Sequence, residues 1–177
     1  MLKDNKNDAQ YYIDKLNMTV HEEGGSFSEL YRSSTIVQCP ELTSNMPCLS
    51  VIYFLQKQNT RDLFHEFPMD EAASIHIGLA VEVFIIYPDD GTYEIKKLGF
   101  DIDSNENFTV VIKKNSIFSY KTPKNKESDC NFSLFSCSVA PAFDYTLFKL
   151  YNDEEILERF PSLNSALLDF FALEEQK

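Results

Sequence analysis

The middle of the chain carries compact apolar runs of strand length. Residues 49–55 and 80–87 are both rich in β-branched and aromatic side chains, which favour β-strands. Pro88-Asp-Asp-Gly91 follows the second run and precedes residues 92–98, so this stretch predicts a β-hairpin. Further strands are predicted at 108–112, 116–120 and 131–139. Many short strands separated by turns are typical of an all-β sandwich or barrel, which we expect to span residues 18–150.

The two ends of the chain have helical patterns instead. Residues 1–17 form a lead-in in which Asn7 or Asp8 can cap a short helix, and apolar residues recur there at helical spacing: Ala9, Tyr12, Ile13 and Leu16. Near the C-terminus, Asn152 and Glu155 have the spacing of a capping box. We therefore expect helices within residues 151–177.

Pro161 should end the first C-terminal helix, and Ser162 can cap a second one. The second helix would carry an apolar stripe at positions i, i+3, i+4, i+7 and i+8: Leu163, Ala166, Leu167, Phe170 and Phe171. We expect the stripe to pack on the sheet. The alternative is a face for a partner or a second copy.

Length and charge narrow the class of protein. The chain has 177 residues, of which 44% are hydrophobic, which is enough for one domain (1–177) with a real core. Its net charge of −12 disfavours binding to nucleic acid and to lipid headgroups. No apolar run approaches the ~20 residues that cross a bilayer. The polar N-terminus lacks a signal-peptide pattern, and the four cysteines form no Cys-x-x-Cys pair, so we expect a cytoplasmic protein with free thiols.

Several well-known catalytic motifs are missing from the sequence. It contains no Gly-x-Gly-x-x-Gly, no Walker-type Gly-Lys-Ser/Thr, no Gly-x-Ser-x-Gly and no His-Glu-x-x-His. The sequence therefore gives no reason to assign the protein to the dehydrogenases, NTPases, hydrolases or zinc proteases that carry these motifs. Only His21, His65 and His76 are available for imidazole chemistry.

Polar residues and glycines instead form an ordered series along the predicted barrel. His21-Glu-Glu-Gly-Gly25 opens it, and the glycine pair suits a tight turn into a strand. His65, Glu71 and Gly78 follow, and then Leu98-Gly-Phe-Asp101. The segment from Cys137 to Tyr145, Cys-Ser-Val-Ala-Pro-Ala-Phe-Asp-Tyr, closes the series.

With these motifs the chain resembles the RmlC-like cupins, in particular the small family of unknown function called cupin family five, over residues 11–161. The resemblance implies a double-stranded β-helix, a jelly-roll barrel with a ligand pocket at its mouth, in a homodimer. The family pattern is kept at Glu23 and Asp70-Glu71 but changed at Glu22, Ser28, Glu66 and Ala73-Ser74. The changes cluster where a pocket would lie.

Three functions remain open. The first is binding of a small polar molecule without robust catalysis, in a pocket lined by His65, Glu71, Tyr53, Arg32 and Glu29, with Ser74 and His76 as further candidates. The second follows from similarity to RmlC-like epimerases, which act on sugars or sugar nucleotides. There His65 would be the general base, oriented by Glu71 or Asp70, and Tyr53 would face the same pocket.

Arg32 would hold a carboxylate or phosphate of the ligand. Residues 29 and 32 face opposite sides of a regular strand, so both enter the pocket only if a bulge intervenes. A third possibility is a metal-dependent enzyme. The sequence requires no cofactor, but His65 and Glu71 could bind a divalent metal with His76, provided that Ser74 and His76 point inward. A pocket of converging polar groups would favour an enzyme, and one filled by Phe and Ile would favour a binding protein.

Overall fold

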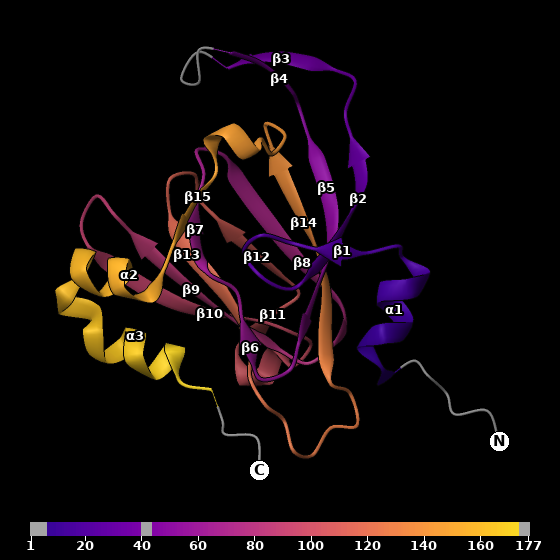
Figure 1. Cartoon of the computed structure of the whole chain (residues 1–177), viewed down its shortest axis with the longest axis vertical. Coiled ribbons are helices and arrows are strands. Elements are labelled where there is room, and N and C mark those ends of the chain that lie inside the picture. The colour runs from indigo at the N-terminus through magenta and orange to yellow at the C-terminus, as the bar shows by residue number, and fades with distance from the viewer. Residues whose placement is uncertain (1–6, 40–43, 174–177) are drawn as a thin grey trace.

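The computed structural model describes residues 7–39 and 44–173, and shows two β-sheets that face each other in a jelly roll (Figure 1). The first sheet has the order β1 (Thr19–Val20), β2 (Ser26–Arg32), β5 (Ser50–Lys57), β14 (Phe132–Ala140), β8 (Asp70–Gly78), β12 (Thr109–Ile112). The second has the order β11 (Glu106–Asn107), β10 (Thr92–Leu98), β9 (Val81–Tyr87), β13 (Ile117–Thr122), β7 (Phe64–Glu66), β15 (Lys149–Tyr151). The short strand β6 (Thr60–Arg61) pairs with β13.

A separate hairpin of β3 (Ile36–Cys39) and β4 (Ser44–Pro47) extends beyond the sheets at the top of Figure 1. Short 3-10 turns cover Ile102–Ser104 and Tyr145–Leu147. The all-β jelly roll that the sequence predicted is confirmed. The sequence pattern gave no indication of β3, β4 or β7.

The predicted hairpin between β9 and β10 is present. Gly91 has a φ of +68°, which suits glycine, and Asp90 Oδ1 accepts a hydrogen bond from the Thr92 backbone N–H at 2.9 Å. Tyr87 and Thr92 then pair across the two strands. The local turn chemistry therefore fixes the register of this hairpin.

Alternation along the strands separates the interior of the barrel from its outer faces. In β9, Val83 and Ile85 face the core between the sheets, whereas Phe84 and Ile86 face outward. In β8, Ala73 and Ile75 belong to the inner core, whereas His76 is exposed. This period of two decides which polar residues can reach the interior.

The C-terminal helices α2 (Asp153–Arg159) and α3 (Asn164–Phe171) pack on the outer face of the second sheet (Figure 1). Leu167 and Phe170 of α3 contact a cluster that includes Phe84, so the expectation that the stripe covers the sheet is confirmed. The capping box of Asn152 and Glu155 is also confirmed.

The expected cap at Ser162 is wrong. This residue lies inside a 3-10 turn, Pro161–Leu163, and α3 begins at Asn164 without a side-chain cap. Because residues 161–163 form a 3-10 turn that leads directly into α3, the residue at the N-cap position is Leu163 and not Ser162.

The N-terminal helix α1 (Ala9–Lys15) lies on the outer face of the first sheet, beside β5 and β14. Of the two cap candidates, Asp8 is the one used, since its side chain accepts a hydrogen bond from Gln10 N at 3.1 Å. All four cysteines are free thiols. In residues 7–39 and 44–173, no helix has both the length and the apolar character needed to span a membrane.

Candidate functional site

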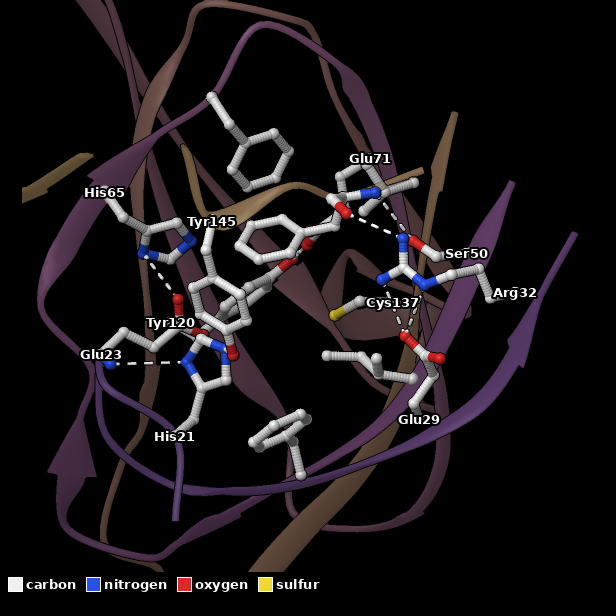
Figure 2. A pocket seen from close by; sticks show the side chains of 15 residues that line it. His21, Glu23, Glu29, Arg32, Ser50, His65, Glu71, Tyr120, Cys137 and Tyr145 are labelled. Atoms are coloured by element: carbon white, nitrogen blue, oxygen red, sulfur yellow. Dashed lines mark hydrogen bonds and ion pairs between the residues drawn. The ribbon is translucent and has the colours of Figure 1, made fainter. Parts of the chain in front are cut away.

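A cavity enters the barrel between the two sheets (Figure 2). Side chains from β2, β5, β7, β8, β13 and β14 line it, together with residues just before β2 and just after β14. The lining residues are His21, Glu23, Phe27, Glu29, Arg32, Ser50, Ile52, His65, Phe67, Glu71, Tyr120, Cys137, Val139, Phe143 and Tyr145.

The Gly24-Gly25 turn places His21 and Glu23 at the cavity. Both glycines have positive φ angles, and Gly24 N donates a hydrogen bond to His21 O at 3.2 Å. A Cβ at Gly25 would lie 2.7 Å from the Phe54 ring, so a larger residue would clash there. The turn that the sequence predicted here is therefore required by both backbone conformation and packing.

His65 on β7 is held in one tautomer. Its Nδ1 lies 2.9 Å from Leu63 O and 3.4 Å from Glu23 Oε2. A carbonyl oxygen only accepts, so Nδ1 carries the hydrogen and Nε2 is left as an acceptor, directed toward the cavity (Figure 2). Burial lowers the pKa of His65 to about 3, so the ring is neutral at neutral pH.

Glu71 on β8 lies at the opposite sheet and is bonded to Tyr120 of β13. The Tyr120 hydroxyl donates to Glu71 Oε1. Burial raises the pKa of Glu71 to about 7, and hydrogen bonds from Tyr120 and Cys137 counteract part of this rise. Glu71 therefore exchanges a proton near neutral pH.

His21 has a partner on the segment after β14. The Tyr145 hydroxyl lies 3.2 Å from His21 Nε2, and Glu23 N donates to His21 Nδ1 at 3.4 Å. Because Nδ1 accepts, Nε2 carries the hydrogen and donates to Tyr145. Burial lowers the pKa of His21 to about 4, so both histidines of the cavity are neutral.

Arg32 and Glu29 meet at the mouth of the cavity. The pairing of β2 with β5 is irregular between Glu29 and Tyr31, which provides the bulge that two inward side chains require. Arg32 Nη2 and Nε donate to Glu29 Oε2 at 2.8 and 3.0 Å, and Nη1 donates to Phe143 O at 3.0 Å. Both residues line the cavity.

Tyr53, Ser74 and His76 do not reach the cavity, in contrast to the expectation. In β8 the inward positions are those of Glu71, Ala73 and Ile75, so residues 74 and 76 face outward. Ser74 Oγ instead lies 2.8 Å from Thr109 Oγ1. Tyr53 packs edge-on against His76 on the same outer face, with ring centroids 5.7 Å apart.

Three of the proposed partnerships therefore change. The trio of His65, Glu71 and His76 is not assembled as a metal site. Asp70 does not orient His65, since it is exposed and accepts a hydrogen bond from Lys114 N at 2.8 Å. The tyrosine beside Glu71 is Tyr120, not Tyr53.

Among the described residues, a different trio has metal-like spacing. Glu23, Asp62 and His65 are buried and each offers a ligand atom within 4.8 Å of the others. Asp62 Oδ1 accepts from Ser119 Oγ and Tyr120 N, while the buried Oδ2 has no hydrogen-bond partner. The two carboxylates suit a divalent cation, but the His65 atom next to Glu23 is Nδ1, which already donates to Leu63 O. The acids fit a metal, and the imidazole fits only if this bond is given up.

The surroundings of Glu23 and Asp62 disfavour the charged forms of these two carboxyl groups. Burial and repulsion from neighbouring carboxylates raise the pKa of Glu23 and of Asp62 well above their ordinary values. In the sequence, Glu23 stands out only as part of the opening motif and family pattern, and nothing singles out Asp62 or Tyr120. No local signal marks Asp62, because its burial depends on β13, which is distant in sequence.

Comparison with known proteins agrees with this architecture. Residues 10–151 match the family model described as the Cupin superfamily (DUF985). A hypothetical protein from Leishmania major has a TM-score of 0.83 and 25% identity, over 94% of this chain and 99% of that one. A protein from Shewanella oneidensis has a TM-score of 0.79 and 28% identity, over 94% and 98%.

More distant structures share the fold alone. A variant of oxalate decarboxylase from Bacillus subtilis is similar with a TM-score of 0.52 and 15% identity, over 84% of this chain and 36% of that one. No curated protein matches the sequence. The family match covers most of the chain and agrees with the jelly roll and its cavity, and the chain therefore belongs to the cupin superfamily, in the family described as DUF985.

Proposed function

We propose that the protein binds a small polar molecule in the barrel cavity, without robust catalysis. One observation carries the assignment of a binding site to this cavity: Arg32, His65 and the Glu71–Tyr120 pair all line it. A small number of polar groups among apolar and aromatic walls is typical of ligand pockets. The binding residues would be Arg32, Glu29, His65 and Glu71.

The geometry favours binding over catalysis. A general base works best when its pKa is close to the working pH, and burial holds the pKa of His65 at about 3. Arg32 is already paired with Glu29, and His21 with Tyr145. Aromatic rings of Phe27, Phe67 and Phe143 supply much of the wall, which suits a binding pocket, whereas the converging polar groups are the feature expected of an enzyme.

A sugar or sugar-nucleotide isomerase is the second candidate, and Glu71 is the observation that favours it. Its pKa of about 7 suits proton transfer near neutral pH, and Tyr120 lies beside it as a possible acid. In this candidate Glu71 replaces His65 as the base. A metal-dependent enzyme is a third candidate, with Glu23, Asp62 and His65 as ligands.

The assembly and location of the protein remain proposals as well. The family resemblance supports a homodimer, which size-exclusion chromatography with light scattering would test. Four free thiols support a cytoplasmic location. The net charge of −12 supports the absence of nucleic-acid and membrane partners.

A thermal-melt panel of sugars, nucleotide sugars, amino acids and divalent metals tests the proposed function. A compound at ~100 times its Kd stabilises the fold by about 2.7 kcal/mol, which gives a measurable rise in Tm. The rise should disappear in His65→Gln and persist in His76→Gln, the matched variant on the outer face. A rise that survives His65→Gln, or no rise with any compound, would contradict binding in the cavity.

A further inference from the structure

One end of the cavity is acidic and lacks a cationic partner. Glu23 and Glu71 line the cavity and are 9% and 6% exposed, and Asp62 lies fully buried within 4.8 Å of Glu23. Among the described lining residues, no Lys or Arg lies at this end.

The guanidinium that influences Asp62 most directly is held outside the barrel. Arg61 forms an ion pair with Asp153 and lies 4.5 Å over the ring of Phe171 on α3. Asp62 keeps one buried oxygen, Oδ2, without a hydrogen-bond partner. An unsatisfied buried acceptor is costly, so the acidic end has capacity for a further donor or cation.

The mouth of the cavity has the opposite character. Arg32 is the cationic residue among the lining side chains, and it is 39% exposed, so a ligand can reach it. Three of its nitrogens donate to Glu29 and Phe143, which leaves two of its five N–H groups for a ligand. Figure 2 shows Arg32 and Glu29 on one side of the cavity and Glu23, His21 and His65 on the other.

Aromatic side chains line the space between these two ends. Phe143 and Tyr145 stand edge to face with ring centroids 4.9 Å apart, and Phe27 and Phe67 also line the cavity. Faces of aromatic rings attract ammonium groups, and their apolar surface suits short methylene chains. The wall therefore accepts a cationic group and the carbon chain attached to it.

We propose that the ligand of this cavity is a small aminocarboxylate. Its ammonium group would lie against Glu23 and Glu71, and its carboxylate would bind Arg32 at the mouth. This inference rests on the proposed function, which assigns a small polar ligand to the same cavity. An aminocarboxylate offers a cation to the acidic end and an anion to the two remaining N–H groups of Arg32 at once, whereas a neutral sugar brings no cation to Glu23 and a metal ion serves only the acidic end.

Isothermal titration calorimetry with matched probes tests the proposal. The zwitterions are glycine, β-alanine, 4-aminobutyrate and 5-aminovalerate, which vary the distance between the two charges. Butylamine, butyrate and butyramide carry only one charge or none. We expect one of the zwitterions to bind at least tenfold more tightly than each of the three singly charged or neutral probes.

Variants locate the binding. Glu23→Gln and Arg32→Gln should each weaken the best zwitterion at least tenfold, while the exposed neighbour variant Glu22→Gln should leave its affinity unchanged. Glu71→Gln gives a second test of the acidic end if Glu23→Gln does not fold, as judged by circular dichroism. Equal binding of zwitterion and single-charge probes, or full affinity in Arg32→Gln, would overturn the inference.

The outcomes separate this inference from the proposed function. If sugars or nucleotide sugars bind in the cavity and no zwitterion does, the inference fails and the proposed function stands. If Zn²⁺ or Mn²⁺ alone binds and amines do not, a metal ion is the occupant of the acidic end and the inference again fails. If no compound binds, both fail.

Discussion

Tyr120 and Glu71 join the two sheets across the cavity. Tyr120 lies on β13 of the second sheet, and its hydroxyl donates to Oε1 of Glu71 on β8 of the first. Both side chains are buried, at 2% and 6% exposure. The bond therefore connects sequence-distant strands at the place where the candidate ligand would bind.

Removing this hydroxyl should destabilise the protein. Tyr120→Phe removes the hydroxyl donor of the buried Glu71 carboxyl and leaves Cys137 as its remaining partner, which costs about 1–3 kcal/mol. Urea denaturation measures the loss, and Tyr53→Phe on the outer face is the matched control, expected to change the unfolding free energy little. Equal effects of the two substitutions would show that the Glu71 contact contributes no stability.

The raised pKa of Glu71 predicts a pH-dependent loss of stability. The folded protein binds the proton more tightly than the unfolded chain, so the contribution of Glu71 is full below pH 4.5 and is lost as pH rises to about 7. The free-energy advantage of the wild type over Glu71→Gln should fall across this window, by at most about 1.4 kcal/mol per pH unit. Urea titrations at closely spaced pH values measure it, and a flat difference would mean that Glu71 titrates normally.

The lowered pKa of His65 predicts a contribution to stability that rises with pH, opposite in direction to that of Glu71 and at lower pH. Its folded pKa of about 3 lies below the ordinary 6.5, so its stabilising contribution is present above pH 6.5 and is lost as pH falls toward 3. His65→Gln keeps a donor for Leu63 O but cannot titrate, and should be less sensitive to acid than the wild type. Acid-unfolding curves followed by circular dichroism test this, with the exposed His76→Gln expected to behave like the wild type.

Gly25 should tolerate substitution poorly. Gly25→Ala combines a φ of +68° with a Cβ 2.7 Å from Phe54, and we expect a loss above the roughly 1–2 kcal/mol of left-handed strain alone. Gly91→Ala has the same φ but no atom within 4 Å of the new Cβ, so it should show the strain alone. Thermal denaturation compares the two, and an equal drop in Tm would remove the argument from packing against Phe54.

The C-terminal helix should contribute to stability through one face only. Leu167 is fully buried against the second sheet, and Leu167→Ala should cost about 2–5 kcal/mol through lost burial and a cavity. Its neighbour Leu168 is 55% exposed, so Leu168→Ala should stay within about 0.5 kcal/mol. Chemical denaturation measures both. A small loss for Leu167→Ala would show that α3 contributes little to the fold.

The sequence by itself determined the features that depend on near neighbours. The turn ending at Gly91, the capping box at Asn152 and the apolar stripe through Leu167 were all predicted, because backbone conformation and helical spacing are local properties. The ordered motifs along the chain indicated the family, and the family resemblance implied the jelly roll.

Only the tertiary structure decided which side chains share the cavity. In a regular strand the odd spacing between Glu71 and His76 already implies opposite faces, but sequence could not show whether β8 is regular, and β2 does contain a bulge. Tyr120 and Asp62 gave no local signal, since their burial and partners arise from strands far apart in sequence. Strand pairing over long distances in the chain thus placed the polar groups, and local pattern could not predict their convergence.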